Sequence, residues 1–207
     1  MKDYNYTWLN WAKELQAIAQ NGLAYTQNPF DEERYTRLRE ISAEIMSLYS
    51  SLSVKKVMNL FCNEQGFQTP KIDTRAAIFK NNKILLVKEN DGRWSLPGGW
   101  CDFDQTIKTN TEKEVLEEAG LIVKAIKIIA IQDRNKYNKP ICAYNVCKFF
   151  ILCKVISGEF RQNIETIDSK YFSKDELPIL SEDKNTKEQI EMCFEAKNNE
   201  NWITLFD

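Results

Sequence analysis

The spacing of apolar residues changes near residue 66, and this change limits the folds that the chain can adopt. Before Gly66, apolar side chains recur every three or four residues, as they do along one face of a helix. After Thr74, short apolar runs bounded by turn residues predict strands. The polar segment between them, which includes Pro70, follows neither pattern. We therefore predict a helical domain over residues 1–66 and an α/β domain over residues 67–207.

Three helices are predicted in the first domain. Asn21-Gly22 is expected to end the first helix, and Ser53 to cap the third. The first helix carries an apolar stripe of Trp8, Trp11, Ala12, Leu15, Ile18 and Ala19, and the second carries one of Tyr35, Leu38, Ile41, Ile45 and Leu48. Such stripes need a partner surface, which predicts packing on the second domain or in a homodimer. An alternative is that Trp11 and Tyr25 help to form a pocket for a base or for choline.

The second domain is predicted to begin with two strands, a turn and a helix. Strands are predicted over residues 74–80, 83–89, 121–133 and 144–158, with a shorter one near Tyr171. A final helix is predicted to begin at a capping box formed by Thr186 and Gln189. This order of elements predicts a mixed α/β fold.

Charge and composition narrow the classes of partner. The 207 residues include 28 basic and 30 acidic side chains, which give a net charge of −2. No overall positive field is available to hold nucleic acid or an anionic membrane, so a small-molecule substrate is favoured. The longest apolar stretch is interrupted by Lys148 and Lys154 and is too short to span a membrane.

The cysteines and the missing histidine bear on location and chemistry. The six cysteines show no CxxC spacing, which indicates reduced thiols without structural zinc. The first residues lack the pattern of a secretory signal, so we expect a cytoplasmic protein. The chain has no histidine, the commonest general base, so carboxylates or a metal-activated water must do that work.

Three glutamates mark the candidate site. Glu114, Glu117 and Glu118 are spaced three and four residues apart, so they share one face of a predicted helix. Like charges in this arrangement destabilise a helix unless a cation relieves them, and a hard divalent cation fits oxygen ligands best. We expect Glu118 to lie on the solvent-facing side of this helix.

The same residues also fit an ordinary amphipathic helix. Val115 and Ala119 would then point inward, and Gly120 would end the helix in the left-handed conformation. The preceding turn favours the functional interpretation. Gly98 and Gly99 there allow the backbone to approach the helix closely and leave carbonyl groups to face a ligand.

The segment from Gly99 to Leu121 resembles the Nudix box, in which a glycine is followed after five residues by Glu, after seven more by Arg-Glu, and then by Glu-Glu and Gly. The match includes Gly99, Glu114, Val115, Glu117, Glu118, Gly120 and Leu121. Two positions depart from it, with Gln105 at the first Glu and Lys113 at the Arg. In the family these two positions commonly form a supporting ion pair.

The resemblance extends beyond the box. The run from Trp8 to Ser47 resembles the helical extension of a bacterial subfamily that hydrolyses X-linked nucleoside diphosphates, including CDP-choline and ADP-ribose pyrophosphatases. The segments at residues 164–166, 176–180 and 184–190 resemble the same subfamily, whose box also lacks the first Glu and carries Lys for Arg. This implies an α/β/α sandwich with a mixed sheet after a small helical domain.

The resemblance also implies a chemistry, the Mg²⁺-dependent or Mn²⁺-dependent hydrolysis of a pyrophosphate bond. We expect Glu114 and Glu118, one helical turn apart, to be the principal metal ligands. Glu117 is expected to be a further ligand or to orient water, and the Gly98 carbonyl to be a backbone ligand. Glu117 and Glu118 are accordingly the predicted catalytic residues of the helix.

Other residues are candidates for the base and for substrate binding. A separate base is expected from the loop that contains Glu165 and Asp168, although both could be solvated loop charges. Arg75 and Arg93 could each clamp a phosphate, because a guanidinium forks onto two oxygens. Either could equally be a surface residue, and Arg75 is the better candidate because its strand leads toward the box.

Three functions remain open from the sequence. The first is hydrolysis of a nucleoside diphosphate linked to another group, CDP-choline or ADP-ribose above all. The second is a catalytically silent ligand sensor, suggested by Gln105 and Lys113. The third is an RNA-processing Nudix enzyme, which the acidic pI of about 5.5 disfavours.

Overall fold

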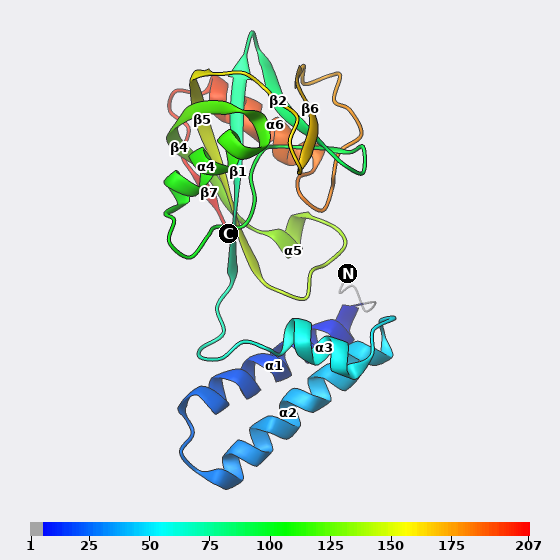
Figure 1. Cartoon of the computed structure of the whole chain (residues 1–207). Coiled ribbons are helices and arrows are strands. Elements are labelled where there is room, and N and C mark those ends of the chain that lie inside the picture. Colours follow the sequence, from blue (N-terminus) through cyan, green and yellow to red (C-terminus); the bar gives the residue numbers. More distant parts are fainter. Residues whose placement is uncertain (1–5) are drawn as a thin grey trace. The chain divides into compact units, whose positions relative to one another are not determined.

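The computed structural model describes residues 6–207, which separate into two compact units (Figure 1). The first unit ends at Pro70 and the second is Lys71–Asp207, so the division falls after the predicted one at residue 66. The intervening segment is held to the helices by hydrogen bonds. The Gln20 side chain donates to the Gly66 carbonyl at 3.0 Å, and the Gln68 amide donates to the Asn21 side chain at 2.8 Å. The predicted lack of a secretory signal falls partly on residues 1–5, which lie outside the described residues.

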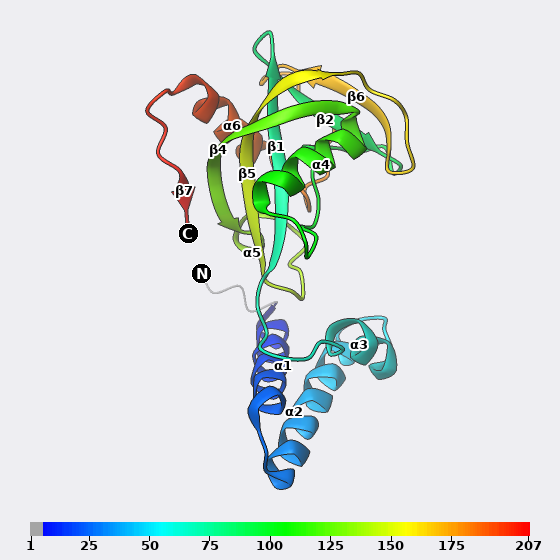
Figure 2. The same cartoon turned by 60° about the vertical axis from the view of Figure 1, so that its left-hand side comes forward.

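Three helices form the first unit, namely α1 (Thr7–Tyr25), α2 (Pro29–Leu48) and α3 (Val54–Phe61). Asn28 and Ser53 cap the second and third helices with their side chains. Helices α1 and α2 lie side by side (Figures 1 and 2), and small residues allow their close approach. Ala12 and Ala43 are fully buried, and the Ser42 hydroxyl donates to the Ala12 carbonyl at 2.7 Å.

Two predictions for the first helix are wrong. The helix does not end at Asn21-Gly22 but continues to Tyr25, and Gly22 instead faces the ring of Tyr35, which a Cβ atom would meet. The buried face is also rotated from the predicted stripe. Trp11 and Ile18 are 59% and 47% exposed, whereas the buried residues of the helix are Leu9, Ala12, Gln16, Ala19 and Gln20.

The second unit is built on one mixed sheet. Its strands are β1 (Lys71–Lys80), β2 (Lys83–Glu89), β3 (Trp94–Ser95), β4 (Leu121–Asp133), β5 (Val146–Gly158), β6 (Thr166–Phe172) and β7 (Leu205–Phe206). The order is β3-β2-β1-β5-β4-β7, with β6 also paired to β2. Strand β1 runs parallel to β5, and β4 runs parallel to β7, while the other pairs are antiparallel. The predicted mixed α/β fold is confirmed.

Helices cover both faces of this sheet (Figures 1 and 2). Successive residues of a strand point to opposite faces, so Phe150 and Ile151 of β5 belong to different cores. The helix α6 (Lys187–Asn198) packs with Phe150, and α4 (Ile107–Ala119) packs with Ile151. The predicted sandwich is therefore confirmed. The short helix α5 (Arg134–Tyr137) and strand β7 have no counterpart in the sequence-based predictions.

Two further observations concern the described residues. None of their helices is long and apolar enough to cross a membrane. All six cysteines are free.

Candidate active site

The turn before α4 runs along the edge of β1. The Pro97 carbonyl accepts from the Ala76 amide and the Gly99 carbonyl accepts from the Thr74 amide, both at 2.8 Å. Gly98 lies between them with φ +139°, where a Cβ atom would collide with the Thr74 carbonyl oxygen. Only glycine fits this position, because any side chain would be both strained and obstructed.

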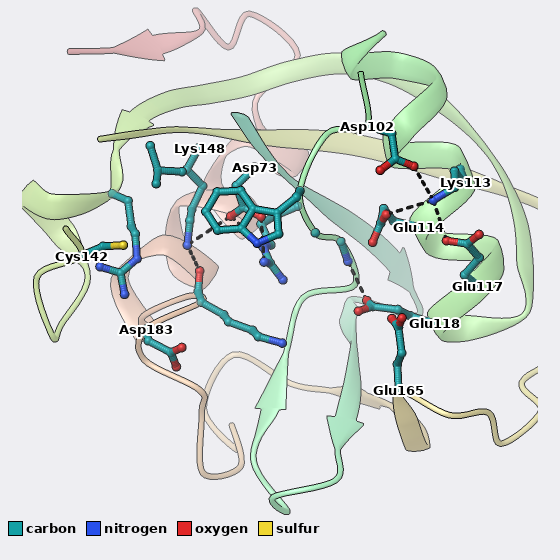
Figure 3. A pocket seen from close by; sticks show the side chains of 17 residues that line it. Asp73, Asp102, Lys113, Glu114, Glu117, Glu118, Cys142, Lys148, Glu165 and Asp183 are labelled. Carbon is teal, nitrogen blue, oxygen red and sulfur yellow. Dashed lines mark hydrogen bonds and ion pairs between the residues drawn. The ribbon is translucent and has the colours of Figure 1, made fainter. Parts of the chain in front are cut away.

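Helix α4 ends at Gly120 as the sequence predicts, and its start at Thr106 was not predicted. The Thr106 side chain caps its first turn, and Gly120 ends it with φ +66°. Glu118, however, is not on a solvent-facing side, and that prediction is wrong. It is 7% exposed, because the turn lies over it, and its Oε2 accepts a hydrogen bond from the Gly98 amide at 2.7 Å (Figure 3).

Lys113 organises the exposed side of the same helix. Its Nζ lies 2.9 Å from a Glu117 oxygen, 3.1 Å from Asp102 and 3.5 Å from Glu114 (Figure 3). Hydrogen bonds to Glu117 and Asp102 raise the pKa of Lys113. The Gln105 side chain lies outside this network and donates to Asp104 at 3.4 Å, while its backbone amide donates to the Asp102 carbonyl at 3.1 Å. Asp102 thus supplies the acidic partner that the box lacks at position 105.

The glutamates and the carbonyl groups of the turn offer only oxygen atoms as possible metal ligands. Burial raises the pKa of Glu118 to about 7 and also raises the pKa of Glu114, so both carboxylates lack sufficient compensating positive charge. Among residues 6–207, no hydrogen bond ends on the Gly98 carbonyl. Oxygen donors with excess negative charge are the ligands that hard divalent cations prefer.

The carboxylates are nevertheless not gathered into a ready-made metal cluster. Across the described part of the chain, no three acidic, cysteine or histidine side chains lie close enough to hold a metal ion. Glu118 turns to the Gly98 amide, whereas Glu114 and Glu117 turn to Lys113. A cation bound here would therefore have to draw the carboxylates away from these internal partners.

The glutamates line one end of a pocket of about 580 Å³. Arg75 lies near the glutamates, because its charge partly opposes the effect of burial on the pKa of Glu118 and Glu114. It contacts Asp73 through Nη2 at 2.8 Å and Nε at 3.1 Å, and its Nη1 donates to the Leu96 carbonyl. Lys148 lies 3.5 Å from Asp73 and also donates to the Lys184 carbonyl. Figure 3 shows Lys148 and Asp73 well apart from Glu114 and Glu117. The pocket thus has an acidic end and an end of mixed charge.

The two predicted arginines are placed differently. Arg75 is buried and lines the pocket, but most of its donors are already used. Arg93 does not line the pocket and pairs with Asp91 at 2.7 Å on the surface. The structure therefore brings only Arg75 to the glutamates' pocket.

The two predicted loop carboxylates, Glu165 and Asp168, also differ in where they lie. Glu165 lines the same pocket as Glu118, whereas Asp168 is exposed on β6 outside it. The Asn163 side chain fixes the loop that carries Glu165, donating to the Glu117 carbonyl at 2.8 Å and accepting from the Glu165 amide at 2.9 Å. The loop is thereby attached to the last turn of α4.

Several pocket residues were not predicted, namely Asp73, Trp100, Asp102, Arg134, Lys148 and Lys184. Lys148 did leave a signal, because it shares its strand face with Val146 and Phe150, both of which are buried. Lys148 is 1% exposed. A lysine that is buried in this way requires partners for its charge.

The buried ammonium of Lys148 predicts a pH-dependent stability. Burial and the charge of Arg75 lower its pKa from 10.5 to about 7, so the charged form penalises the folded state fully below pH 7. The penalty disappears as pH rises toward the pKa that Lys148 has in the unfolded chain. We expect the unfolding free energy of the wild type, relative to Lys148→Met, to rise by about 2 kcal/mol between about pH 7 and pH 9. Urea unfolding at both pH values measures this, and a constant difference would contradict it.

Comparison with known proteins identifies the family. The description "NUDIX domain" matches residues 70–193, which is more than half of the chain. The chain belongs to the Nudix family. Residues 6–61 of this Nudix hydrolase match the description "UDP-X-like, N-terminal oligomerisation domain". The resemblance of the box and of the helical extension is confirmed.

Relatives similar to this Nudix hydrolase carry related names. The Bacillus subtilis protein "Putative ADP-ribose pyrophosphatase YjhB" is 39% identical over 201 residues, 97% of each chain. A crystal structure of an ADP-ribose pyrophosphatase from Streptococcus suis is 57% identical with a TM-score of 0.63, covering 67% of this chain and 100% of that one. A crystal structure of a UDP-X diphosphatase is 33% identical with a TM-score of 0.64, covering 96% and 97%. The chain is a Nudix pyrophosphohydrolase, a class that generally depends on divalent metals.

Proposed function

We propose that this Nudix hydrolase cleaves the pyrophosphate bond of a nucleoside diphosphate linked to a second group, with ADP-ribose and UDP-X compounds as the leading substrates. The products would be a nucleoside monophosphate and a phosphorylated second group. The names of the similar proteins support this class, and CDP-choline belongs to it chemically. The observation that carries the proposal is the buried Glu118 carboxylate held against the Gly98 turn in a pocket shared with Glu114 and Glu117.

The residues of the acidic end can divide the work among them. Glu114, Glu118 and the Gly98 carbonyl would hold Mg²⁺ or Mn²⁺, with Glu117 as a further ligand or as the group that orients water. The chemistry that a divalent cation supplies in such a site is neutralisation of negative charge on the pyrophosphate oxygens. Asp102 would keep Lys113 in place when the glutamates turn toward the cation.

Accepting the proton from water and neutralising the charge of the substrate require two different groups. Glu165 is the proposed base, because it lines the same pocket as Glu118 and its carboxylate can accept a proton from an attacking water. Arg75 would contribute positive charge to the pocket lining. Its guanidinium would not clamp a phosphate with two hydrogen bonds, because it is already held by Asp73 and Leu96. Arg93, outside the pocket, is not proposed to contact the phosphates.

The helical unit and the cysteines support two further proposals. The match of residues 6–61 to an oligomerisation domain supports a homodimer. The free cysteines suit a reducing compartment, and we propose that the enzyme works in the cytoplasm.

A substrate panel tests the proposed function. The purified chain would be incubated with ADP-ribose, UDP-glucose, CDP-choline, NADH and diadenosine polyphosphates, with Mg²⁺, with Mn²⁺ or with a chelator. We expect release of AMP or UMP that the chelator abolishes. Binding of these compounds without release would favour a silent sensor. Salt-sensitive binding of RNA without hydrolysis of the panel would favour the RNA-processing alternative.

A further inference from the structure

Trp100 follows the Gly98–Gly99 turn and presents an exposed indole on a fixed backbone. Its side chain is large and apolar, yet the residue is 56% exposed. The backbone around it is held on both sides, because the Cys101 amide donates to the Ile72 carbonyl at 2.9 Å and the Asn110 side chain donates to the Trp100 carbonyl at 3.2 Å. An exposed ring on a fixed backbone beside a substrate pocket is suited to stacking, because the backbone loses little freedom when a ligand binds.

The same residue also lines a second hollow next to the active-site pocket. This hollow, which we call the Trp100 hollow, measures about 410 Å³ and is lined by Lys71, Ile72, Trp100, Cys101 and Tyr144. Trp100 is the residue that lines both spaces. A ligand lying on the indole could therefore extend from the hollow to the glutamates without leaving the protein surface.

The lining of the Trp100 hollow differs chemically from that of the active-site pocket. Two of its five residues are aromatic, and its one charged group is Lys71, whose Nζ lies 5.7 Å from the centre of the Tyr144 ring. Aromatic faces stack well on flat rings of any base. They also hold quaternary ammonium groups, but the ammonium of Lys71 would repel such a cation. The hollow thus favours a flat neutral ring over choline.

We propose that the Trp100 hollow binds the nucleobase of the substrate, stacked on the indole of Trp100, while the pyrophosphate lies at the acidic end of the active-site pocket. This inference rests on the proposed function, because it assigns one part of that substrate to one part of the surface. Trp100 is then a residue that positions the substrate through its base and takes no part in bond cleavage.

Binding of nucleotides by three variants tests the proposal. Isothermal titration would measure the Kd of AMP, of UMP and of ribose 5-phosphate, which lacks a base, for the wild type, Trp100→Ala and Trp100→Phe. Phe103→Ala is the matched control, because Phe103 is fully exposed and lines neither space. We expect Trp100→Ala to raise the Kd of AMP or UMP roughly 10- to 100-fold. Ribose 5-phosphate should be unaffected, Trp100→Phe should retain most of the affinity, and Phe103→Ala should behave as the wild type.

Several results would overturn the proposal. One is equal affinity of Trp100→Ala and the wild type for both nucleotides, and another is an equal loss for ribose 5-phosphate. If Trp100→Ala does not fold, Tyr144→Leu must weaken nucleotide binding while sparing ribose 5-phosphate, and its failure to do so counts against the hollow. In steady-state kinetics the loss should appear in KM, with kcat nearly unchanged.

The outcomes also separate this inference from the proposed function. Nucleotide binding that depends on Trp100, in a protein that hydrolyses none of the panel, would support the hollow and refute the proposed hydrolysis. Hydrolysis of the panel with no effect of Trp100→Ala on KM would refute the hollow alone.

Discussion

Glu118→Gln is expected to fold normally and to lose turnover by several orders of magnitude. The glutamine oxygen can still accept the hydrogen bond from the Gly98 amide, so the turn should keep its place. The variant removes the negative charge that a cation would require, and it also removes the cost of burying a carboxylate whose pKa burial raises to about 7. Folding stability near neutral pH should therefore be equal or higher.

The measurement is kcat on the preferred substrate with Mg²⁺, together with thermal unfolding. Glu191→Gln is the control for the loss of a helical carboxylate, because Glu191 lies on α6 outside the pocket and is more exposed than Glu118. Near-normal activity of Glu118→Gln would refute its assignment as a metal ligand. Loss of activity accompanied by loss of folding would show a structural role instead.

Gly98→Ala is expected to destabilise the second unit by about 3–5 kcal/mol and to abolish activity. The added methyl group would collide with the Thr74 carbonyl, so either β1 or the turn must move. Either movement would separate the Gly98 amide from Glu118. The loss should appear in urea unfolding and in kcat together.

Gly92→Ala separates the two causes of this loss. Gly92 also has a positive φ, +87°, but a Cβ atom there would meet nothing within 4 Å. It should therefore cost only the backbone strain, about 1–2 kcal/mol, and leave activity intact. If Gly98→Ala were no more damaging than Gly92→Ala, the close approach to β1 would not be essential.

Local signals predicted the elements around the site well. The end of α4 depends on Gly120 and the start of α6 on Thr186, and each of these acts on backbone groups within four residues of itself. Such information is present in any short stretch of sequence. The sandwich of helices and sheet was implied by the resemblance to the Nudix family, and the division of β5 residues between two cores agrees with it.

Contacts between distant segments were the ones that sequence reasoning missed. Helical periodicity places Glu118 on a face, but it cannot show that the Gly98 turn, twenty residues earlier, covers that face. Lys148 was interpreted as an interruption of an apolar strand, whereas its ammonium is held by Asp73 of the neighbouring strand. The Asn21-Gly22 signal for a helix end was likewise overridden by packing of Gly22 on Tyr35.

The attachment of the Glu165 loop to α4 has a consequence for how substrate preference could diverge. Asn163 joins the loop to the Glu117 carbonyl, so the proposed base and the proposed metal ligands are carried by one framework. The residues of the Trp100 hollow come from other segments, at positions 71–72, 100–101 and 144. Mutations there can change which nucleotide is accepted while the bond-breaking groups keep their spacing. Relatives that catalyse the same reaction can therefore come to prefer different substrates.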